Sequence, residues 1–405
     1  MDKILKSVKL DNVSYDIRGP VKHTADKMMQ QGIDIINLFS GNPPAFGINA
    51  PDEIIQDMVL NLKNAEAYSH ENGIFPARKA IMQFYQLKGI MDIKLENIFI
   101  GNGVSEMILM SMQGLLNNRD EVLVPAPDYP LWTAAVNLSG GKAVHYICDE
   151  SQDWFPDLQD LESKITQNTR GIVVINPNNP TGAVYPKEIL EKIVDLAVRH
   201  KLIIFADEIY DRILYDDVVH TPLATLSQEI LFVSFNGLSK SHRIPGFRTG
   251  WMVLSGNTAN AKDYIEGLNI LAGMRMCSNV PSQYIIQTAL GGYQSLTQLI
   301  SPGGRLLEQR NAAYKIFNSM PGISCVKPTS TLYLFPKIDT KKYKVTDDEQ
   351  FVLDFLLDKK VLLVHGRAFN WGQPDHFRVV FLPSVKELEI VGARMTEFLT
   401  DYSQK

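Results

Sequence analysis

Short apolar runs alternate with longer amphipathic segments between about Asn97 and Trp251. Two of the longer segments, Ser105–Leu116 and Pro186–His200, have the spacing of helices that bury one face. The short runs are typical of strands buried in a sheet: Asn97–Gly103, Glu121–Pro127, Ala143–Asp149, Gly171–Pro177, Leu202–Glu208, Ile230–Phe235 and Gly250–Ser255. This alternation predicts an α/β fold with a mainly parallel central sheet covered on both faces.

The pattern changes after about Gly303. Two helical stretches, Arg305–Met320 and Asp347–Asp358, are interleaved with short strands at Leu332–Ile338 and Phe377–Leu382, which indicates a smaller α+β domain. We find no internal repeat and no low-complexity tract. The predicted division is an N-terminal arm that belongs to the small domain, a large domain and a C-terminal small domain: residues 1–49, 50–300 and 301–405.

Composition narrows the class of protein. With 405 residues the chain can bury a large core, and 45% hydrophobic and 21% charged residues are ordinary for a globular protein. A net charge of −5 argues against a nucleic-acid partner. No apolar run reaches the ~18–20 residues of a membrane span, and Met1–Leu10 lacks the apolar stretch of a signal peptide. The three cysteines have no metal or redox spacing, so we expect no metal and reduced thiols in a cytoplasm.

A lysine and an arginine eight positions apart are the first chemical candidates. Lys240 follows the strand Ile230–Phe235, and Arg248 lies in Gly-Phe-Arg on the same loop. A nucleophilic lysine needs a pKa below its usual value of about 10.4, and a neighbouring cation lowers it. Arg248 would also bind a phosphate. A single Ser-Lys pair on a turn is more often only an exposed side chain, so other residues must decide.

Two further motifs follow predicted strands. Ile175–Gly182 turns immediately after its strand, and Asn179 in it can donate a hydrogen bond to a ring oxygen, although a plain Asn-Pro turn has the same sequence. Asp207 ends the strand Leu202–Glu208, and Tyr210 lies three residues further on. An acid at this place is either a buried carboxylate paired with a cation or a capping residue.

Candidate anion-binding groups come from two distant parts of the chain. The backbone N–H groups of Gly103, Val104 and Ser105 follow a strand and open a helix, which suits a phosphate; a simple N-cap by Ser105 is the alternative. Arg378 begins a short strand near the C-terminus, where a forked guanidinium can bind a carboxylate or simply face solvent. A lysine that forms a Schiff base, together with an acid for a pyridinium nitrogen, describes a pyridoxal 5′-phosphate site.

The sequence resembles the fold-type-I, class I/II aminotransferases over nearly its whole length, and within them bacterial glutamate–pyruvate (alanine) aminotransferases. The resemblance implies a pyridoxal 5′-phosphate enzyme that interconverts L-alanine plus 2-oxoglutarate with pyruvate plus L-glutamate by a ping-pong mechanism, in alanine biosynthesis. The stretches that carry it are YDIRGP (Tyr15–Pro20), PAPDYPLWTAA (Pro125–Ala135), INPNNPTGAVY (Ile175–Tyr185), FADEIYDRILYDD (Phe205–Asp217) and NGLSK (Asn236–Lys240).

The resemblance also implies roles around the cofactor. Lys240 forms the Schiff base and moves the substrate α-proton, and Asp207 keeps the ring nitrogen protonated. Tyr210 and Asn179 hydrogen-bond the phenolic oxygen of the ring. Tyr129 stacks on the ring, although a core aromatic is the alternative. The groups that meet the phosphate are Arg248, Ser239 and the backbone of Gly103, Val104 and Ser105, with Tyr68 reaching in from a second subunit of a homodimer.

On the substrate side, the resemblance implies that Arg378 binds the α-carboxylate beside Asn179 and Tyr129, and that Gly41 lets backbone approach the substrate. We hypothesise that Arg18, with Tyr15 closing over it, is the cation that receives the distal carboxylate of glutamate. The alternative is that this N-terminal segment only packs against the rest of the protein and binds no substrate.

Some residues depart from the aspartate-type branch of the family. Gly237 stands where that branch has a phosphate-binding serine, and Arg275 is one place away from its distal-carboxylate arginine. We read His242 and Arg243 as loop packing. The alternatives left open are an aminotransferase of other or broader specificity (aspartate, valine, aromatic), a C–S lyase or decarboxylase of the same fold, and a non-catalytic sensor. The sensor would need an added basic DNA-binding segment, which the first forty residues do not resemble.

Overall fold

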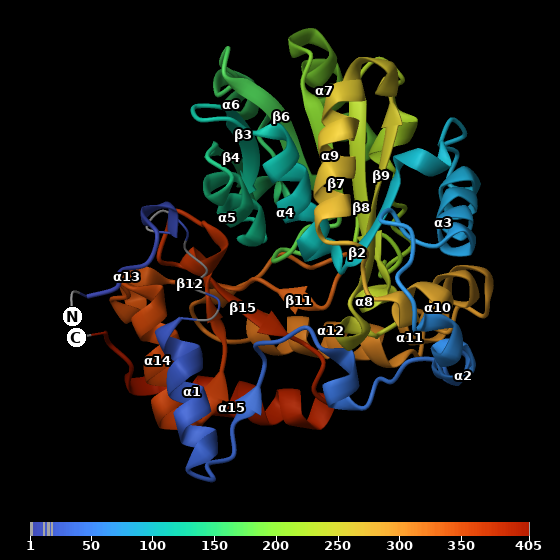
Figure 1. The fold of residues 1–405 in the computed structure, drawn as a ribbon. Coiled ribbons are helices and arrows are strands. Elements are labelled where there is room, and N and C mark those ends of the chain that lie inside the picture. Colours follow the sequence, from blue (N-terminus) through green and yellow to red (C-terminus); the bar gives the residue numbers. More distant parts are fainter. Residues whose placement is uncertain (1–2, 11–12, 14–16, 18, 405) are drawn as a thin grey trace.

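An eight-stranded sheet forms the centre of the molecule (Figure 1). The structure is a computed structural model that describes residues 3–10, 13, 17 and 19–404. The strand order is β2-β9-β8-β7-β6-β3-β4-β5. In chain order the strands are β2 (Ile98–Asn102), β3 (Glu121–Ala126), β4 (Lys142–Asp149), β5 (Phe155–Pro156), β6 (Thr169–Ile175), β7 (Ile203–Asp207), β8 (Leu231–Gly237) and β9 (Thr249–Gly256).

Most neighbouring strands in this sheet are parallel. The run β4-β3-β6-β7-β8 is parallel throughout, whereas β9 is antiparallel to both β8 and β2. Because β9 is antiparallel to both of its neighbours, β2 is parallel to β8. The carboxyl end of β2 therefore lies at the same edge of the sheet as the carboxyl ends of the parallel strands. The predicted α/β class and mainly parallel sheet are confirmed. This edge is where ligands bind in open α/β sheets.

Helices cover both faces of the sheet (Figure 1). Successive side chains of a strand point to opposite faces, so Val173 and Ile175 join one hydrophobic cluster and Ile172 and Val174 the other. The first cluster includes residues of α4 (Val104–Leu115), α5 (Leu131–Leu138) and α9 (Lys262–Met274), and the second includes α7 (Lys187–His200). The other helices of this region are α2 (Asp52–Asn61), α3 (Phe75–Leu87), α6 (Leu158–Ser163), α8 (Leu238–Ser241), α10 (Val280–Gly291) and α11 (Leu296–Ile300).

Smaller sheets form the remainder, where the two ends of the chain meet (Figure 1). The N-terminal β1 (Ile36–Asn37) pairs in parallel with β13 (Val361–Leu362), and α1 (Pro20–Gln30) contacts α14 (Asp348–Lys359). The remaining elements are β10 (Ile323–Ser324), β11 (Tyr333–Leu334), β12 (Lys337–Ile338), β14 (Val364–His365), β15 (Phe377–Val380), α12 (Arg305–Asn318), α13 (Thr340–Tyr343) and α15 (Val385–Asp401). The domain boundaries at residues 49/50 and 300/301 stay a prediction.

Two expectations about strands are wrong. The predicted strand Leu332–Ile338 divides into β11 and β12, which belong to different sheets, because Pro336 has no N–H to continue a ladder. The predicted buried strand at Ala143–Asp149 is β4, whose side chains alternate in exposure, with Ile147 46% exposed. β4 lies next to the edge of the sheet, with only the two-residue β5 beyond it. None of the described helices is long and apolar enough to cross a membrane.

Candidate active site

A cavity of about 240 Å³ opens at the carboxyl ends of the parallel strands, between the large sheet, the N-terminal segment and the C-terminal sheets. One water needs only ~10–15 Å³, so the cavity has room for an aromatic cofactor and part of a substrate. Most of the predicted site residues line it: Gly41, Val104, Ser105, Tyr129, Asn179, Asp207, Tyr210, Ser239, Lys240, Arg248 and Arg378.

Lys240 reaches the cavity from the short helix α8, directly after β8. The turn from β8 into α8 places its amine beyond the carboxyl end of the sheet, where Nζ donates a hydrogen bond of 2.8 Å to the Gly41 backbone oxygen. The same amine lies 5.9 Å from the centre of the Tyr210 ring. The lysine is therefore held by one carbonyl from the N-terminal segment and is only partly buried.

Asp207 is a buried acid at the end of β7. Its Oδ2 accepts a hydrogen bond of 3.0 Å from the Trp132 indole, and its Oδ1 accepts a longer one of 3.4 Å from the Ile209 backbone N–H. Burial raises the pKa of Asp207 to about 6, although both donors act to lower it. The expected cationic partner is not a protein group, because no lysine, arginine or histidine of the described chain forms an ion pair with Asp207.

Arg248 and the start of α4 form an anion-binding corner. The Arg248 guanidinium donates to the Pro245 and Asn102 carbonyls at 3.0 and 3.2 Å and to the Ser105 hydroxyl at 3.0 Å. Within residues 19–404 no carboxylate neutralises it. Helix α4 begins at Val104, so its first N–H groups and the positive end of its dipole face the same place. The alternative of Ser105 as N-cap is wrong, since the cap residue is Gly103.

One detail of the phosphate prediction changes. The Gly103 N–H donates to the Gly101 carbonyl at 2.8 Å, so it is already used, and the N–H groups of Val104 and Ser105 remain as the candidates. Gly103 has a φ of 84° and lies so close to Arg248 that an added Cβ would meet its Nη2 at 2.2 Å. The role of Gly103 in the structure is thus to let the guanidinium approach the helix start.

Arg378 lies on β15 and lines the same cavity. It is buried between two aromatic rings, with its guanidinium 4.4 Å from the Tyr333 centroid and 4.7 Å from the Phe369 centroid. Nη1 donates to the Asn179 Oδ1 at 3.2 Å and Nη2 to the Phe39 carbonyl at 2.6 Å. These contacts fix the plane of the guanidinium, which suits bidentate binding of a carboxylate.

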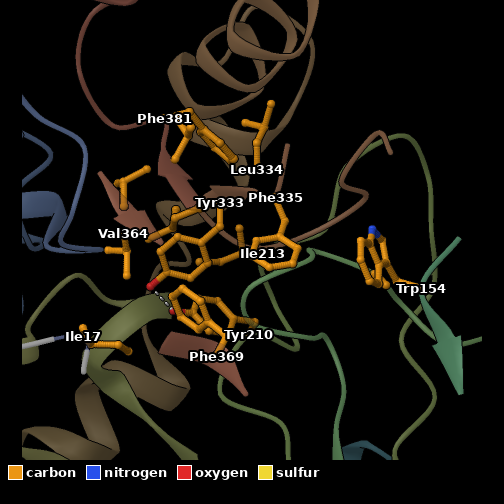
Figure 2. Close-up of a cluster of buried hydrophobic side chains, with 14 of the residues drawn as sticks. Ile17, Trp154, Tyr210, Ile213, Tyr333, Leu334, Phe335, Val364, Phe369 and Phe381 are labelled. Atoms are coloured by element: carbon orange, nitrogen blue, oxygen red, sulfur yellow. Dashed lines mark hydrogen bonds between the residues drawn. The ribbon is translucent and has the colours of Figure 1, made fainter. Parts of the chain in front are cut away.

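Sequence reasoning missed two residues that contact this set. Trp132, from α5, donates to Asp207, and Tyr333, from β11, brings its hydroxyl within 2.7 Å of the Tyr210 hydroxyl (Figure 2). No sequence signal identified either residue, because Tyr333 reaches the site only through the pairing of β11 with β15. Gly41 lies against this hydroxyl: a Cβ at position 41 would be 2.2 Å from the Tyr333 oxygen.

Some predicted residues are not in the cavity. Tyr68 is 79% exposed and does not line it within this chain. Tyr15 and Arg18 lie outside the described residues. Arg275 pairs with Glu106 and donates to the Ile100 carbonyl at 2.6 Å, so it is engaged within its own subunit. At Gly237, the other departure from the aspartate-type branch, a Cβ would lie 2.6 Å from the Thr249 carbonyl, which leaves no room for a serine.

His242 and Arg243 also point away from the cavity. The His242 Nε2 lies 2.7 Å from the Ala289 carbonyl, and the Arg243 guanidinium donates to the Asn49 carbonyl at 2.8 Å and to the Ser295 hydroxyl at 2.6 Å. Burial lowers the pKa of His242 to about 4, and the cation of Arg212 acts in the same direction. A neutral, fully bonded histidine is a packing residue.

The donor set around the cavity fits pyridoxal 5′-phosphate. The buried Asp207 carboxylate without a protein cation suits a protonated ring nitrogen, and the cationic corner at Arg248 suits a phosphate. The Lys240 amine lines the same cavity as Asp207 and Arg248. Among the described residues no cluster of side chains could hold a metal ion.

Comparisons with known proteins agree with this chemistry. The family model for aminotransferase class I and II matches residues 33–394. The chain is 60% identical over 404 residues to glutamate-pyruvate aminotransferase AlaA of Escherichia coli (strain K12), covering 100% of both chains. It is 51% identical to alanine aminotransferase of Mycobacterium tuberculosis (strain H37Rv), covering 98% of this chain and 93% of that one.

Solved structures give the same result. An aminotransferase from Escherichia coli superimposes with a TM-score of 0.99 at 59% identity, covering 100% of both chains. The alanine aminotransferase from Pyrococcus furiosus has a TM-score of 0.93 at 35% identity, covering 98% of this chain and 100% of that one. With this sheet, this donor set and these relatives, the chain belongs to the class I and II aminotransferases and uses pyridoxal 5′-phosphate.

Proposed function

We propose that this enzyme transfers an amino group between L-alanine and 2-oxoglutarate, forming pyruvate and L-glutamate in two half-reactions, and that it serves alanine biosynthesis. The names of relatives at 60% and 51% identity support these substrates. The observation that carries the chemistry is the convergence of Lys240, Asp207 and Arg378 on one cavity. A buried acid, an amine and a fixed guanidinium are what a transamination site requires.

Pyridoxal 5′-phosphate, when bound, supplies an aldehyde for amine exchange and a ring that withdraws electrons from the substrate α-carbon. Asp207 holds the proton on the ring nitrogen, because burial without a protein cation leaves this carboxylate in need of a positive partner. Arg248, Ser239 and the first N–H groups of α4 hold the phosphate. Tyr129, Asn179 and Tyr210 line the same cavity; Tyr129 would pack against the ring, and Asn179 and Tyr210 would hydrogen-bond its phenolic oxygen.

Arg378 orients the substrate through its α-carboxylate, with its plane fixed by Asn179 and the two aromatic rings. Lys240 would then act as the base that accepts the substrate α-proton at Nζ. The Gly41 carbonyl, which accepts a hydrogen bond from Nζ, keeps the amine on this side of the cavity. Packing of Ile17, Ile108, Ile175 and Ile209 around the cavity excludes water from the reacting atoms.

Arg18 and Tyr15 remain our proposal for the distal carboxylate of glutamate. The support is positional: Ile17 is buried and lines the cavity, so the N-terminal segment reaches the substrate side. Changing Arg18 to Met should raise the KM for glutamate far more than the KM for alanine, whereas the exposed Arg199 changed to Met should alter neither. Equal increases of both KM values in the Arg18 variant would contradict the proposal.

Half-reaction spectroscopy tests the substrate assignment. The purified enzyme is mixed separately with glutamate, alanine, aspartate and valine, and the loss of the visible absorbance of the lysine-bound cofactor is followed in a stopped-flow instrument. Glutamate and alanine should react fastest. If aspartate or valine reacted fastest, the specificity would be wrong. A lyase would instead be indicated by release of sulfide or a thiol from an added sulfur-containing amino acid such as cystathionine or cysteine, without formation of the aminated cofactor.

We also propose a homodimer with shared sites in the cytoplasm. Support for the dimer is a set of large apolar side chains that are exposed in the single subunit, of which the first three lie within ten residues of Tyr68 in the sequence: Val59 62%, Leu60 79%, Phe75 56% and Met274 77%. Burial of these side chains against a second copy would bring Tyr68 towards that subunit, where it would reach the phosphate. The three cysteines are free thiols, which fits a reducing compartment.

A further inference from the structure

A carboxylate lies directly behind the anion-binding corner. Glu106 is in the first turn of α4; its Oε2 accepts a hydrogen bond of 2.6 Å from the Asn102 backbone N–H, and its Oε1 accepts one of 3.2 Å from the Asn102 side chain. The carbonyl of the same Asn102 accepts a hydrogen bond of 3.2 Å from the Arg248 guanidinium. A single residue therefore separates a negative charge from the cation proposed to bind the phosphate.

This carboxylate has two opposing effects. It fastens the end of β2 to the first turn of α4, and an acid in a first turn also stabilises its helix. For a phosphate the same charge is unfavourable, because it repels the anion and offsets the positive helix end at Val104 and Ser105. The Glu106 side chain is only 28% exposed, so water screens the charge only in part.

Arg275 supplies the compensating charge. It directly follows α9, which packs against α4 (Figure 1), and its Nη1 forms an ion pair with the Glu106 Oε2. Its Nη2 donates to the Ile100 and Glu71 carbonyls at 2.6 and 3.2 Å, and its side chain is 14% exposed. These contacts hold the guanidinium against the carboxylate.

We propose that Arg275 is a positioning residue that neutralises Glu106 and thereby allows the start of α4 and Arg248 to bind the cofactor phosphate. The inference rests on the proposed placement of the phosphate at this corner. Glu106 keeps the hydrogen bonds to Asn102 that fix the turn, while its charge is cancelled within the protein. Glu106 and Arg275 are both described by the structure and do not line the cavity, so they act through the residues that do.

The test compares the cofactor with pyridoxal, which has the same ring and aldehyde but no phosphate. We define the phosphate preference of the apoenzyme as the Kd of pyridoxal divided by the Kd of pyridoxal 5′-phosphate, both measured by quenching of tryptophan fluorescence. Arg275→Met leaves the Glu106 charge uncompensated. The phosphate preference should then fall by about tenfold, the effect of one unit charge near a phosphate, while the Kd of pyridoxal changes little.

A second substitution separates the charge of Arg275 from its packing. Glu106→Gln keeps an oxygen for the Asn102 N–H but removes the negative charge, so adding it to Arg275→Met should return the phosphate preference to near the value of the unmodified enzyme. A merely structural role for Arg275 predicts no recovery, because the double variant still lacks the guanidinium contacts. Arg275→Lys keeps the charge without the forked contacts and should retain the preference.

Arg170→Met is the matched control. Arg170 forms an ion pair of 2.7 Å with Asp120, which directly precedes β3, so the pair lies at the amino ends of the strands and away from the cavity. Loss of this pair removes one arginine from the surface of the same sheet without changing the charge at the start of α4. The phosphate preference should stay unchanged.

An unchanged phosphate preference in Arg275→Met, or no recovery in the double variant, would overturn the inference. If Arg275→Met does not fold, Glu106→Gln alone decides: its preference should equal or exceed that of the unmodified enzyme, and a lower value would contradict the charge compensation. Failure of the proposed phosphate site is distinguishable from both, because the unmodified apoenzyme would then bind pyridoxal as tightly as pyridoxal 5′-phosphate.

Discussion

Among single residues, the pKa of Asp207 is set by its burial and by two neutral hydrogen-bond donors, the Trp132 indole and the Ile209 N–H. The Trp132 indole is its shorter hydrogen bond, and no cation of the described chain compensates the carboxylate. Burial without a cationic partner raises the pKa of Asp207 to about 6. Binding of a cofactor with a protonated ring nitrogen would stabilise the ionised carboxylate. The indole N–H favours the ionised form that this pairing needs.

Trp132→Phe should therefore weaken cofactor binding. The change removes one hydrogen bond to a charged group, worth about 1.5–3 kcal/mol, so the Kd of pyridoxal 5′-phosphate should rise by roughly tenfold or more. The measurement is titration of the apoenzyme with cofactor, followed by quenching of tryptophan fluorescence. Trp371→Phe is the matched control, because it removes an indole bond of 2.9 Å to Asp375 outside the cavity. An unchanged Kd in Trp132→Phe would show that the indole does not support Asp207.

At the scale of elements, a buried polar cluster joins the loop after β3 to the turn before β15. Asp128 accepts hydrogen bonds from the Thr133 hydroxyl at 2.8 Å and from the Asn370 side chain at 2.7 Å, and its N–H donates to the Phe369 carbonyl at 2.9 Å. Tyr129 follows Asp128, and Phe369 stacks on Arg378. The cluster therefore fixes the distance between the ring-covering tyrosine and the carboxylate-binding arginine.

The charge state of Asp128 should make the stability of the apoenzyme depend on pH. Burial raises the pKa of Asp128 to about 7, which is above its unfolded value. The folded state thus binds this proton more tightly than the unfolded state does. The proton on Asp128 therefore stabilises the folded state at low pH, and this stabilisation is lost as the pH rises towards 7. The nearby His145, whose pKa burial lowers to about 4, stays neutral in this range.

Asp128→Asn should reduce this pH dependence. Between pH 5 and pH 7 the unmodified apoenzyme should lose about 2 kcal/mol more of its free energy of unfolding than the variant, as measured by urea denaturation at both pH values. Asp216→Asn is the control, since the Arg310 guanidinium holds the pKa of Asp216 at about 2 and neither of its states titrates above pH 5. Identical slopes for Asp128→Asn and the unmodified protein would contradict the assignment.

At the scale of the whole molecule, the cavity is completed by segments from every part of the chain. The N-terminal segment contributes Gly41, the large sheet Asp207 and Lys240, and the C-terminal sheets Tyr333 and Arg378. The proposed dimer adds a contribution from a second copy, because Tyr68 is 79% exposed and does not line the cavity of its own subunit.

A mixed-dimer experiment tests this sharing. Lys240→Ala and Tyr68→Ala homodimers should each have little activity, but after subunit exchange a heterodimer contains one site with an intact lysine and an intact tyrosine. Mixing should restore activity to a sizeable fraction of the unmodified enzyme, and size-exclusion chromatography with light scattering should give the dimer mass throughout. No recovery after proven exchange would mean that Tyr68 serves its own subunit or none.

Local sequence patterns predicted the strands, the edge of the sheet that holds the site and the residues at strand ends. Asp207, Lys240 and Asn179 could be found in this way because each directly follows or ends an apolar run. Tyr333 and Trp132 could not, since their contacts depend on the pairing of distant strands and on the packing of α5. The use of the Gly103 N–H by Gly101 was equally invisible, because it is a feature of turn geometry.

The roles proposed for the cavity residues all depend on a covalent bond between the cofactor aldehyde and the Lys240 amine. Borohydride reduction of the purified enzyme, followed by proteolysis and peptide mass mapping, measures it directly. We expect a phosphopyridoxyl adduct on the peptide that contains Lys240 and no adduct in Lys240→Ala. A reduced enzyme whose Lys240 peptide has the unmodified mass, or an adduct on another lysine, would show that Lys240 does not bind the cofactor.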